Sequence, residues 1–370
     1  MRRIIVSFIV VHPSIVVTRR TMKLTQLPIP LAEIDEILDS PIPYTKDADQ
    51  EEEKKCQVRS ECQDANETST TELSHYSIQD LLATLSPEQI EIAAQSSYAY
   101  WLKSMSVETP APTENQRTRM ALREMRRHLF KVASFDLAVK NLADAIENRQ
   151  TNRVDLMRAC FLEGVEYESP EEEALAAEFR KRIQSDLERQ SGVVRGLDKE
   201  GRSMIVIRSR TESPVSEDEF VTAMLYIMER AIAAVEYASK GAIEKMTVVF
   251  DFGKFSASRA PSIAALKRLA STLQHSYPER LKKLVIIDAA FWMRATYGLI
   301  QPFLDPETKK KFVMVSGDKQ KVQTLTESID EANAAPWMIP GGKFTEEVVL
   351  GHFLEKVPFH MLYDDMPVSS

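Results

Sequence analysis

Features that mark several common classes of enzyme and membrane protein are missing from this chain of 370 residues. Its three cysteines, Cys56, Cys62 and Cys160, are too few for a disulfide framework, so a reducing compartment is expected. No run of 18 or more apolar residues occurs, which argues against a membrane-spanning helix. Only 11 glycines are present, and neither G-x-G-x-x-G nor G-x-x-x-x-G-K-S/T can be found, so no nucleotide site is expected.

Signatures of catalysis and of metal binding are missing as well. The six histidines form neither an H-x-x-x-H nor an H-E-x-x-H pair, and no G-x-S-x-G elbow occurs, so we expect no metal, no cofactor and no catalytic residues. Asp251-Phe252-Gly253 repeats the metal-binding triplet of kinases without its partner motifs. Asp288 follows a predicted strand, where a catalytic acid could lie, but such a residue more often caps the next helix. With 47 basic against 55 acidic residues the net charge is −8, which argues against a nucleic-acid-binding protein.

The first 80 residues divide into a basic and an acidic part. Residues 1–23 contain basic but no acidic side chains, and their apolar stretch is broken by His12-Pro13. A targeting peptide and an upstream extension with Met22 as an alternative start both fit this composition. Residues 33–80 are acidic, contain few large apolar side chains and show no steady period, so we expect them to be mostly disordered. The acidic segment is also a candidate recruitment site for a protein partner.

A helical region is expected to follow. Ser86-Pro87 has the pattern of an N-cap with proline at the first helical position, and it predicts a helix that runs to about Lys103. Three short helices are expected between residues 113 and 161, and a highly charged helix over 170–190. In the charged helix acidic residues precede basic ones, an order that suits the helix dipole.

After Gly192 the pattern changes to strands that alternate with helices. Four apolar runs of strand length are separated by amphipathic segments of helix length, which is typical of βαβ units around a parallel sheet. The predicted strands cover residues 204–207, 246–250, 284–287 and 312–315, and the predicted helices cover 217–237, 261–277 and 291–304. The glycine-flanked turn at 196–201 also predicts a short antiparallel strand over 193–195. The fold class is therefore α/β, with a mostly parallel sheet.

The segment 291–304 carries an apolar stripe at helical spacing. The members of the stripe are Trp292, Ala295, Leu299, Ile300 and Phe303, with Phe291 and Tyr297 widening it. An ordinary core helix would show the same stripe. Gly298 and Pro302 weaken a helix, however, since glycine costs about 1 kcal/mol in its interior and proline removes a backbone hydrogen bond. The residues therefore leave two interpretations open, a core helix and a movable apolar helix.

An ordered set of short motifs runs through residues 113–353. The set comprises Gly196-Leu-Asp-Lys-Glu-Gly-Arg202, Val248-Val-Phe-Asp-Phe-Gly253, Tyr277-Pro-Glu-Arg280, Leu284-Val-Ile-Ile-Asp288, Pro302-Phe-Leu-Asp-Pro306 and Gly341-Gly342. Ser134-Phe-Asp136 and the helix after it belong to the same set. In order and spacing these motifs resemble the CRAL-TRIO lipid-binding family, in particular its Sec-fourteen-like phosphatidylinositol transfer proteins.

The resemblance implies an apolar lipid pocket with the sheet as its floor, preceded by a small all-helical N-terminal domain. It places a gate helix over this pocket at 291–304, the segment with the apolar stripe. The expected pocket residues on the central strand are Met246, Val248 and Phe250. Met246 and Val248 stand where members that bind phosphatidylcholine have a Ser-x-Thr pair, so phosphatidylcholine exchange is not favoured.

The resemblance also implies a headgroup site. Members that bind phosphatidylinositol use the glutamate of Tyr-Pro-Glu-Arg, and the threonine and lysine of Asp-Pro-x-Thr-x-x-Lys. The matching residues here are Glu279, Thr308 and Lys311. Lys311 would neutralise the phosphate, Thr308 would donate a hydrogen bond, and Glu279 would accept one from inositol hydroxyls. The basic pair that precedes Phe-Asp in the family is replaced by Ala133-Ser134.

These observations predict a soluble, cytoplasmic protein that is not an enzyme. It would bind phosphatidylinositol as its cargo, contact membrane surfaces transiently and exchange the lipid between them, without a nucleotide or nucleic-acid partner. A carrier of a small hydrophobic ligand resembling tocopherol or a retinoid, and a membrane-docking scaffold without transfer activity, are the alternatives. The expected parts are an N-terminal extension that is mostly disordered and acidic (1–76), a helical lead-in (77–112), a helical domain (113–165), a lipid-binding domain (166–355) and a tail (356–370).

Overall fold

The computed structural model describes residues 22–42, 78–131, 135–209, 216–253, 260–289, 291–345 and 347–365. The predictions for residues 1–21 and 43–77, which include most of the acidic segment, lie outside these described residues. Among the helices of the described ranges, none is both long and apolar enough to cross a bilayer.

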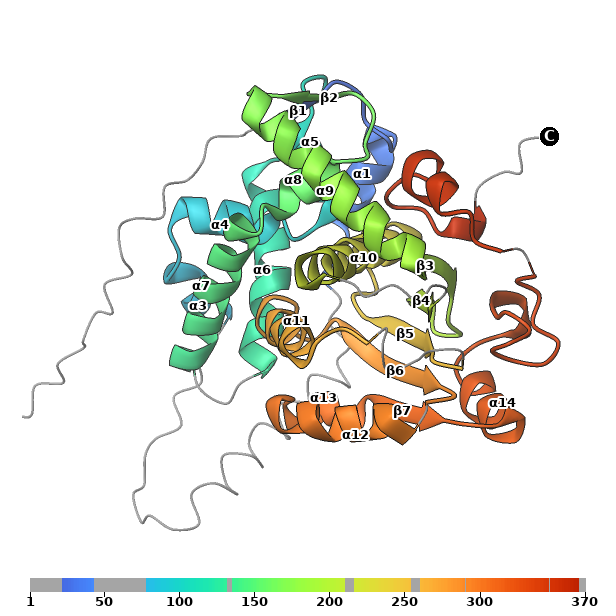
Figure 1. The fold of residues 1–370 in the computed structure, drawn as a ribbon. Coiled ribbons are helices and arrows are strands. Elements are labelled where there is room, and N and C mark those ends of the chain that lie inside the picture. The colour runs from blue at the N-terminus through green and yellow to red at the C-terminus, as the bar shows by residue number, and fades with distance from the viewer. Residues whose placement is uncertain are drawn as a thin grey trace, which may run out of the picture.

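A five-stranded sheet forms the centre of the second half of the chain (Figure 1). Its strands lie in the order β3 (Gln190–Leu197), β4 (Ser203–Ser209), β5 (Met246–Asp251), β6 (Leu281–Ile287) and β7 (Phe312–Val315). β3 and β4 pair antiparallel, and the other neighbours pair parallel. The predicted α/β class with a mostly parallel sheet is therefore confirmed, and β3 is longer than the turn signal predicted.

The two faces of this sheet have different neighbours. Since successive side chains of a strand point to opposite faces, Val249 and Val285 share one face, and Val248 and Leu284 share the other. The first face packs into a closed apolar core with residues of α14 (Asp318–Thr326) and of the segment after it. The second face looks towards α10 (Glu217–Ala238) and α11 (Ile263–Ser276), which Figure 1 shows on one side of the sheet.

Helix α10 is the central helix of the fold. It begins at a capping box, in which Ser216 Oγ accepts from the backbone N–H of Glu219 while the Glu219 carboxylate accepts from the N–H of Ser216. Residues 220–236 are all buried. This helix therefore packs against the sheet on one side and against the helical first half of the chain on the other.

The first half of the described chain is a layer of helices. They are α3 (Ile78–Ala83), α4 (Pro87–Ala94), α5 (Tyr98–Met105), α6 (Glu114–Lys131), α7 (Phe135–Thr151), α8 (Val154–Ala159) and α9 (Pro170–Arg189). The N-cap at Ser86 is confirmed, since its Oγ accepts from the N–H of Gln89. The prediction of a single helix that runs to about Lys103 is wrong, because two helices, α4 and α5, cover this region. Ser97 caps a new helix, α5, because its Oγ accepts from the N–H of Tyr100.

The segment 22–42 is folded, contrary to the prediction that the whole N-terminal extension and the acidic stretch from residue 33 are mostly disordered. Strand β1 (Met22–Leu24) pairs antiparallel with β2 (Val165–Tyr167). Helix α1 (Leu31–Asp39) follows, and it buries Ile34, Ile37 and Leu38. These three apolar residues lie at the i, i+3, i+4 spacing of one helix face, which the acidic residues between them concealed.

Part of the predicted C-terminal tail is anchored on α10. The guanidinium of Arg230 donates to the carbonyl oxygens of Phe353 at 2.7 Å and Val357 at 3.0 Å. It also lies over the Phe353 ring, 3.8 Å from the centroid. Residues 356–365 therefore form part of the packed structure, and 366–370 lie outside the described residues.

The burial of α1 predicts a measurable contribution to stability. Ile34 is fully buried, and replacing it with alanine should lower the free energy of unfolding by about 2–5 kcal/mol, because the lost methyl groups leave a cavity. Chemical denaturation of the full chain measures this change. Val107→Ala, at a side chain that is 52% exposed, is the control and should have little effect. Equal effects of the two substitutions would contradict the packing of α1.

Candidate functional site

An apolar cavity of about 290 Å³ lies between the second face of the sheet and helices α10, α11 and α12 (Phe291–Ile300). A site for one water molecule needs only about 10–15 Å³, so this space is far larger than a packing defect. Most of its wall is formed by apolar side chains of β4, β5, β6, α10 and α11. Among them are Ile205, Ile207, Phe220, Met224, Met228, Val248, Phe250, Leu269, Leu273, Leu284 and Ile286.

Two of the three pocket residues expected on the central strand line this cavity. Val248 and Phe250 face it from β5. Met246 is fully buried but does not line the cavity, so its prediction as a pocket residue is wrong. Met246 is on the same face of β5 as Val248. It is the first residue of the strand, however, and core side chains enclose it there.

Helix α12 turns only part of its predicted apolar stripe to the cavity. Thr296, Tyr297 and Ile300 line the cavity. Ala295, Leu299 and Phe303 belong to the predicted stripe but are exposed, Leu299 by 55% and Phe303 by 53%. Of the predicted stripe, Ile300 therefore faces inwards, and Ala295, Leu299 and Phe303 face outwards. The side chains of Phe291 and Trp292 lie outside the described residues.

The inner side of α12 is packed against the sheet, and its outer side is open. The Tyr297 ring packs on Phe312 of β7, with a centroid distance of 5.3 Å. The next residue, Gly298, is exposed and has open surroundings. Phe303 lies in the short 3-10 helix (Gln301–Phe303) that follows α12, and its exposed ring contacts a cation of α11. Lys267 Nζ lies 4.1 Å from the centroid of this ring. The outer face of this segment thus combines apolar side chains with a cation.

The three headgroup residues expected from the resemblance all line one end of the cavity. Lys311 Nζ lies 3.6 Å from Glu279 Oε2, and Thr308 is one helical turn before Lys311 in α13 (Pro306–Lys310) and its C-cap. The Thr308 hydroxyl donates to Asp305 Oδ2 at 2.7 Å, and the Thr308 N–H donates to Asp305 Oδ1 at 2.8 Å. Held in this way, the hydroxyl oxygen of Thr308 offers acceptor lone pairs to a ligand rather than the donor that the resemblance implied.

Sequence reasoning missed a fourth polar residue at this end, Lys245. Its Nζ donates to Glu279 Oε2 at 3.1 Å, so the Glu279 carboxylate lies between two lysines. Burial raises the pKa of Glu279, but Lys311 and Lys245 outweigh it and hold this pKa below its ordinary value. Lys245 immediately precedes β5, and Glu279 precedes β6 by two residues. The sequence places a lysine just before one predicted strand and a glutamate just before the next. Because neighbouring parallel strands begin at the same edge of a sheet, this pattern could have revealed the pair.

The backbone at Glu279 is strained. Its φ is +57°, in the left-handed region that glycine adopts freely. A non-glycine residue in this region costs on the order of 1–3 kcal/mol and persists where its surroundings fix it. The preceding Pro278 suits a turn of this kind, because proline presets the first corner. The turn 277–280 therefore aims the Glu279 carboxylate at the polar end of the cavity.

The ion pairs at Glu279 predict its titration. Because its pKa in the folded chain lies below the ordinary value of 4.5, the ion pairs stabilise the fold above about pH 4.5, and this stabilisation is lost as the pH falls through the folded pKa. Lys311→Met should raise the Glu279 pKa, as measured by carboxyl-carbon NMR. Lys310→Met, whose lysine pairs with Glu307 instead, should leave the titration unchanged. A Glu279 midpoint that does not respond to Lys311→Met would contradict the pairing.

Comparison with known proteins gives a family for this region. Residues 187–335 match the family described as CRAL/TRIO domain. The chain is 31% identical over 126 residues to a phosphatidylinositol transfer protein of Saccharomyces cerevisiae, PDR17, a match that covers 33% of this chain and 35% of the relative. It is 35% identical over 80 residues to the SEC14 cytosolic factor of Eremothecium gossypii, covering 21% and 26%.

Two further similarities are more distant. Patellin-4 of Arabidopsis thaliana is 26% identical over 136 residues, which covers 36% of this chain and 25% of the relative. The solved structure of Sfh5 covers 60% of this chain and 75% of its own, with 18% identity and a TM-score of 0.40. The chain thus spans about a third or less of the length of the curated relatives named here. Residues 187–335, which contain the sheet, the cavity and its polar end, are thus similar to the CRAL/TRIO domain.

Proposed function

We propose that this chain binds one inositol phospholipid in the apolar cavity and carries it between membranes. One observation carries the proposal: the apolar cavity ends in a polar region, where the Glu279 carboxylate lies between Lys245 and Lys311. A phospholipid has the same division into acyl chains and a charged, hydroxyl-rich headgroup. The similarity to a protein named as a phosphatidylinositol transfer protein supports the proposal.

The acyl chains need such a cavity for a simple energetic reason. A two-chain lipid exposes about 30 methylenes at about 0.8 kcal/mol each, on the order of 20–25 kcal/mol if its chains enter water. A carrier that shields the chains removes this barrier to transfer. The cavity wall, which is mostly apolar and rises from both the sheet and the helices, suits chains without hydrogen-bonding groups.

The polar end favours inositol over choline as a headgroup. Inositol hydroxyls donate hydrogen bonds to a carboxylate, whereas a quaternary ammonium has no N–H or O–H to donate. In the proposed complex Glu279 accepts from these hydroxyls and Lys311 binds the phosphate. Lys245 keeps its contact of 3.1 Å with Glu279 when Lys311 turns to the lipid, so the buried carboxylate retains a cation beside it.

Helix α12 is the proposed gate. Its inner face lines the cavity, while Leu299 and Phe303 on its outer side are more than half exposed. Exposed apolar side chains next to the cation of Lys267 suit contact with a bilayer surface, where their exposure is no longer unfavourable. Contact with a membrane would then favour the open position of the gate over the closed one.

A carrier of a small hydrophobic ligand is the second candidate. The cavity volume of about 290 Å³ favours it, because this value lies near the lower end of ligand pockets. The scaffold alternative implies an empty or collapsed pocket and no exchange of lipid between vesicles, so a transfer measurement distinguishes it from both carriers. Mass spectrometry of lipids extracted from the purified protein distinguishes the two carriers, since each predicts a different cargo.

Removal of the phosphate-binding cation tests the headgroup assignment. Lys311→Ala should lower the transfer of phosphatidylinositol between vesicles by about tenfold to a hundredfold, because a charge-assisted hydrogen bond contributes about 1.5–3 kcal/mol. Lys310→Ala removes an exposed lysine from the same short helix and is the matched control. A carrier of a small apolar ligand would keep its cargo in both variants. Equal transfer by the Lys311→Ala and Lys310→Ala proteins would exclude the proposed headgroup role.

A polar substitution on the outer face of α12 tests the gate. Leu299→Gln should slow phosphatidylinositol transfer several-fold while the amount of bound lipid stays the same, because Leu299 does not line the cavity. Val349→Gln changes an equally exposed apolar side chain away from α12 and should leave the transfer rate unchanged. The measurement is fluorescent lipid transfer between donor and acceptor vesicles. A loss of bound lipid in Leu299→Gln would contradict a role confined to membrane contact.

A further inference from the structure

Two pairs of consecutive residues at the starts of β5 and β6 are linked crosswise. Lys245 Nζ donates to Glu279 Oε2 at 3.1 Å, and Arg280 Nη1 donates to the carbonyl oxygen of Glu244 at 3.3 Å. The N–H of Met246 donates to the carbonyl oxygen of Arg280 at 2.8 Å, which ties the two backbones together. Glu279 lines the polar end of the cavity and Lys245 contacts it there, while the residues next to them, Glu244 and Arg280, contact side chains of α6 in the helical first half of the chain.

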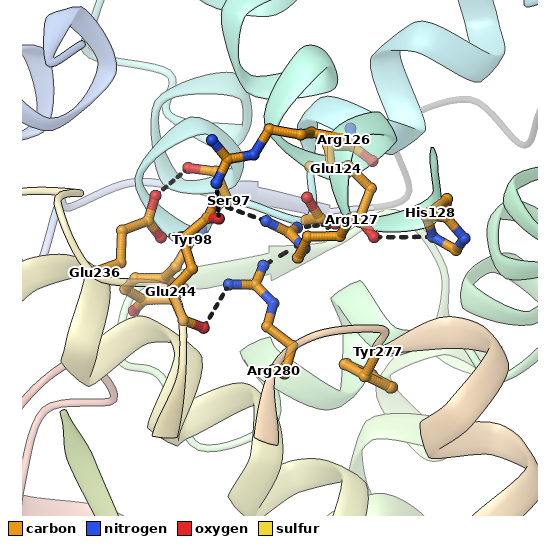
Figure 2. Close-up of polar contacts among 12 residues, drawn as sticks. Ser97, Tyr98, Glu124, Arg126, Arg127, His128, Glu236, Glu244, Tyr277 and Arg280 are labelled. Atoms are coloured by element: carbon orange, nitrogen blue, oxygen red, sulfur yellow. Dashed lines mark hydrogen bonds and ion pairs between the residues drawn. The ribbon is translucent and has the colours of Figure 1, made fainter. Parts of the chain in front are cut away.

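On that inner side, Arg280 and Glu244 join a buried ion-pair network of α6. Arg280 Nη2 lies 4.0 Å from Glu124 Oε2, and Figure 2 shows the Arg280 side chain pointing from its turn towards Glu244 and Glu124. Arg127 pairs with Glu124 and donates to Glu244 Oε1 at 2.7 Å. Glu124 also contacts His128 Nε2 at 3.2 Å. All of these side chains are nearly or fully removed from solvent.

The other end of the same turn is also fixed by a buried charge. Tyr277 Oη donates to Glu229 Oε1 on α10 at 2.6 Å. Glu229 in turn accepts from Arg158 of α8 at 2.6 Å and from Arg149 of α7 at 3.2 Å. Helices of the first half of the chain therefore hold both ends of the turn 277–280, and the strained Glu279 lies between the two anchors.

We propose that Glu124, Arg127 and Arg280 are positioning residues through which helix α6 sets the headgroup selectivity of the lipid cavity. The network would do this by fixing the turn 277–280, and with it the Glu279 carboxylate. This inference rests on the proposed function and adds to it a part of the chain that does not line the cavity.

The electrostatics of the network support this role. Burial raises the pKa of Glu124, but Arg127, His128 and Arg280 outweigh it and hold this pKa well below its ordinary value. Burial, with a contribution from Arg127, lowers the pKa of Arg280 to about 10. The carboxylates of Glu124 and Glu244 together compensate the guanidinium groups of Arg127 and Arg280, which repel each other. With the Glu124 charge removed, Glu244 alone would balance both cations. We expect Arg280 to shift as a result, and Glu279 with it, because the two residues are adjacent in the strained turn.

Most of the apolar wall does not depend on this network in the same way, although Tyr277 and Pro278 of the turn also line the cavity. Val248, Phe250 and the α10 side chains reach the cavity from regular strand and helix positions, remote in sequence from the turn 277–280. A change in the network should therefore alter headgroup binding and leave the binding of a bare acyl chain nearly unchanged. A purely structural role would weaken both kinds of binding together.

The test compares two ligands in the full-length chain. Phosphatidylinositol loading from vesicles is measured by native mass spectrometry, and the binding of a fluorescent fatty acid reports on the apolar wall alone. Glu124→Gln should lower the phosphatidylinositol affinity at least about fivefold relative to the fatty-acid affinity, the lower end of typical coupling between sites. Glu172→Gln is the matched control, because it neutralises another buried carboxylate that lies away from the turn. This carboxylate pairs with Arg153 at a distance of 2.6 Å.

A double-mutant cycle shows whether the effect passes through Glu279. If Glu124 acts by placing that carboxylate, Glu124→Gln should have little further effect on the affinity ratio in a Glu279→Gln background. Additive effects would overturn the inference. Should Glu124→Gln fail to fold, Arg280→Lys decides in its place, since it keeps the charge but loses the reach and the fork of the guanidinium.

The outcomes separate this inference from the proposed function. An unchanged affinity ratio in Glu124→Gln and Arg280→Lys, with normal loading of the wild type, would overturn the coupling alone. Uptake of the fatty acid but not of phosphatidylinositol by the wild type would overturn the proposed function, and the coupling with it.

Discussion

The apolar cavity of about 290 Å³ between the sheet and α10, α11 and α12 has to be held open against the tendency of apolar surfaces to close on one another. Side chains that line an unfilled space lose the contacts that partner atoms would give them, so keeping this space open costs free energy. The net stability of a whole protein is only about 5–15 kcal/mol. The rest of the fold must therefore be packed well enough to bear this cost, and a bound acyl chain stabilises the fold as it fills the space.

The helical first half of the chain supplies much of that packing. One continuous apolar core joins Trp101 of α5, Ile34 of α1, Tyr226 of α10 and Phe359 near the C-terminus. The sheet takes part in it through residues such as Ile205, which also faces the cavity. Helical layer and sheet are thus one folded unit, and α10, buried along nearly its whole length, lies between them. This arrangement explains how residues on α6 can influence a turn at the polar end of the cavity.

The sequence carries some of this structure in patterns that need no tertiary information. Apolar runs of strand length, separated by helix-length segments, predict the parallel strands. The resemblance to a lipid-binding family predicts Val248 and Phe250 as pocket residues, and Glu279, Thr308 and Lys311, which do meet at one end of the cavity. The facing of α12 involves the contact between Tyr297 and Phe312, which no local period encodes. The Lys245–Glu279 pair joins two strands across 34 residues, and α1 is masked by its acidic neighbours. These features follow from partners distant in sequence.

The polar end of the cavity lies at the opposite edge of the sheet from the usual ligand site of such folds. Ligands of open parallel sheets commonly bind at the carboxyl ends of the strands, where glycine-rich loops and helix N-termini hold phosphates. Here Lys245, Glu279 and Lys311 all precede their strands, and no glycine-rich phosphate loop is present in the sequence. The proposed lipid would account for the difference, because its chains need the face of the sheet rather than its edge. In the proposed complex the headgroup would contact side chains, two cations and a carboxylate, near the turn before β6.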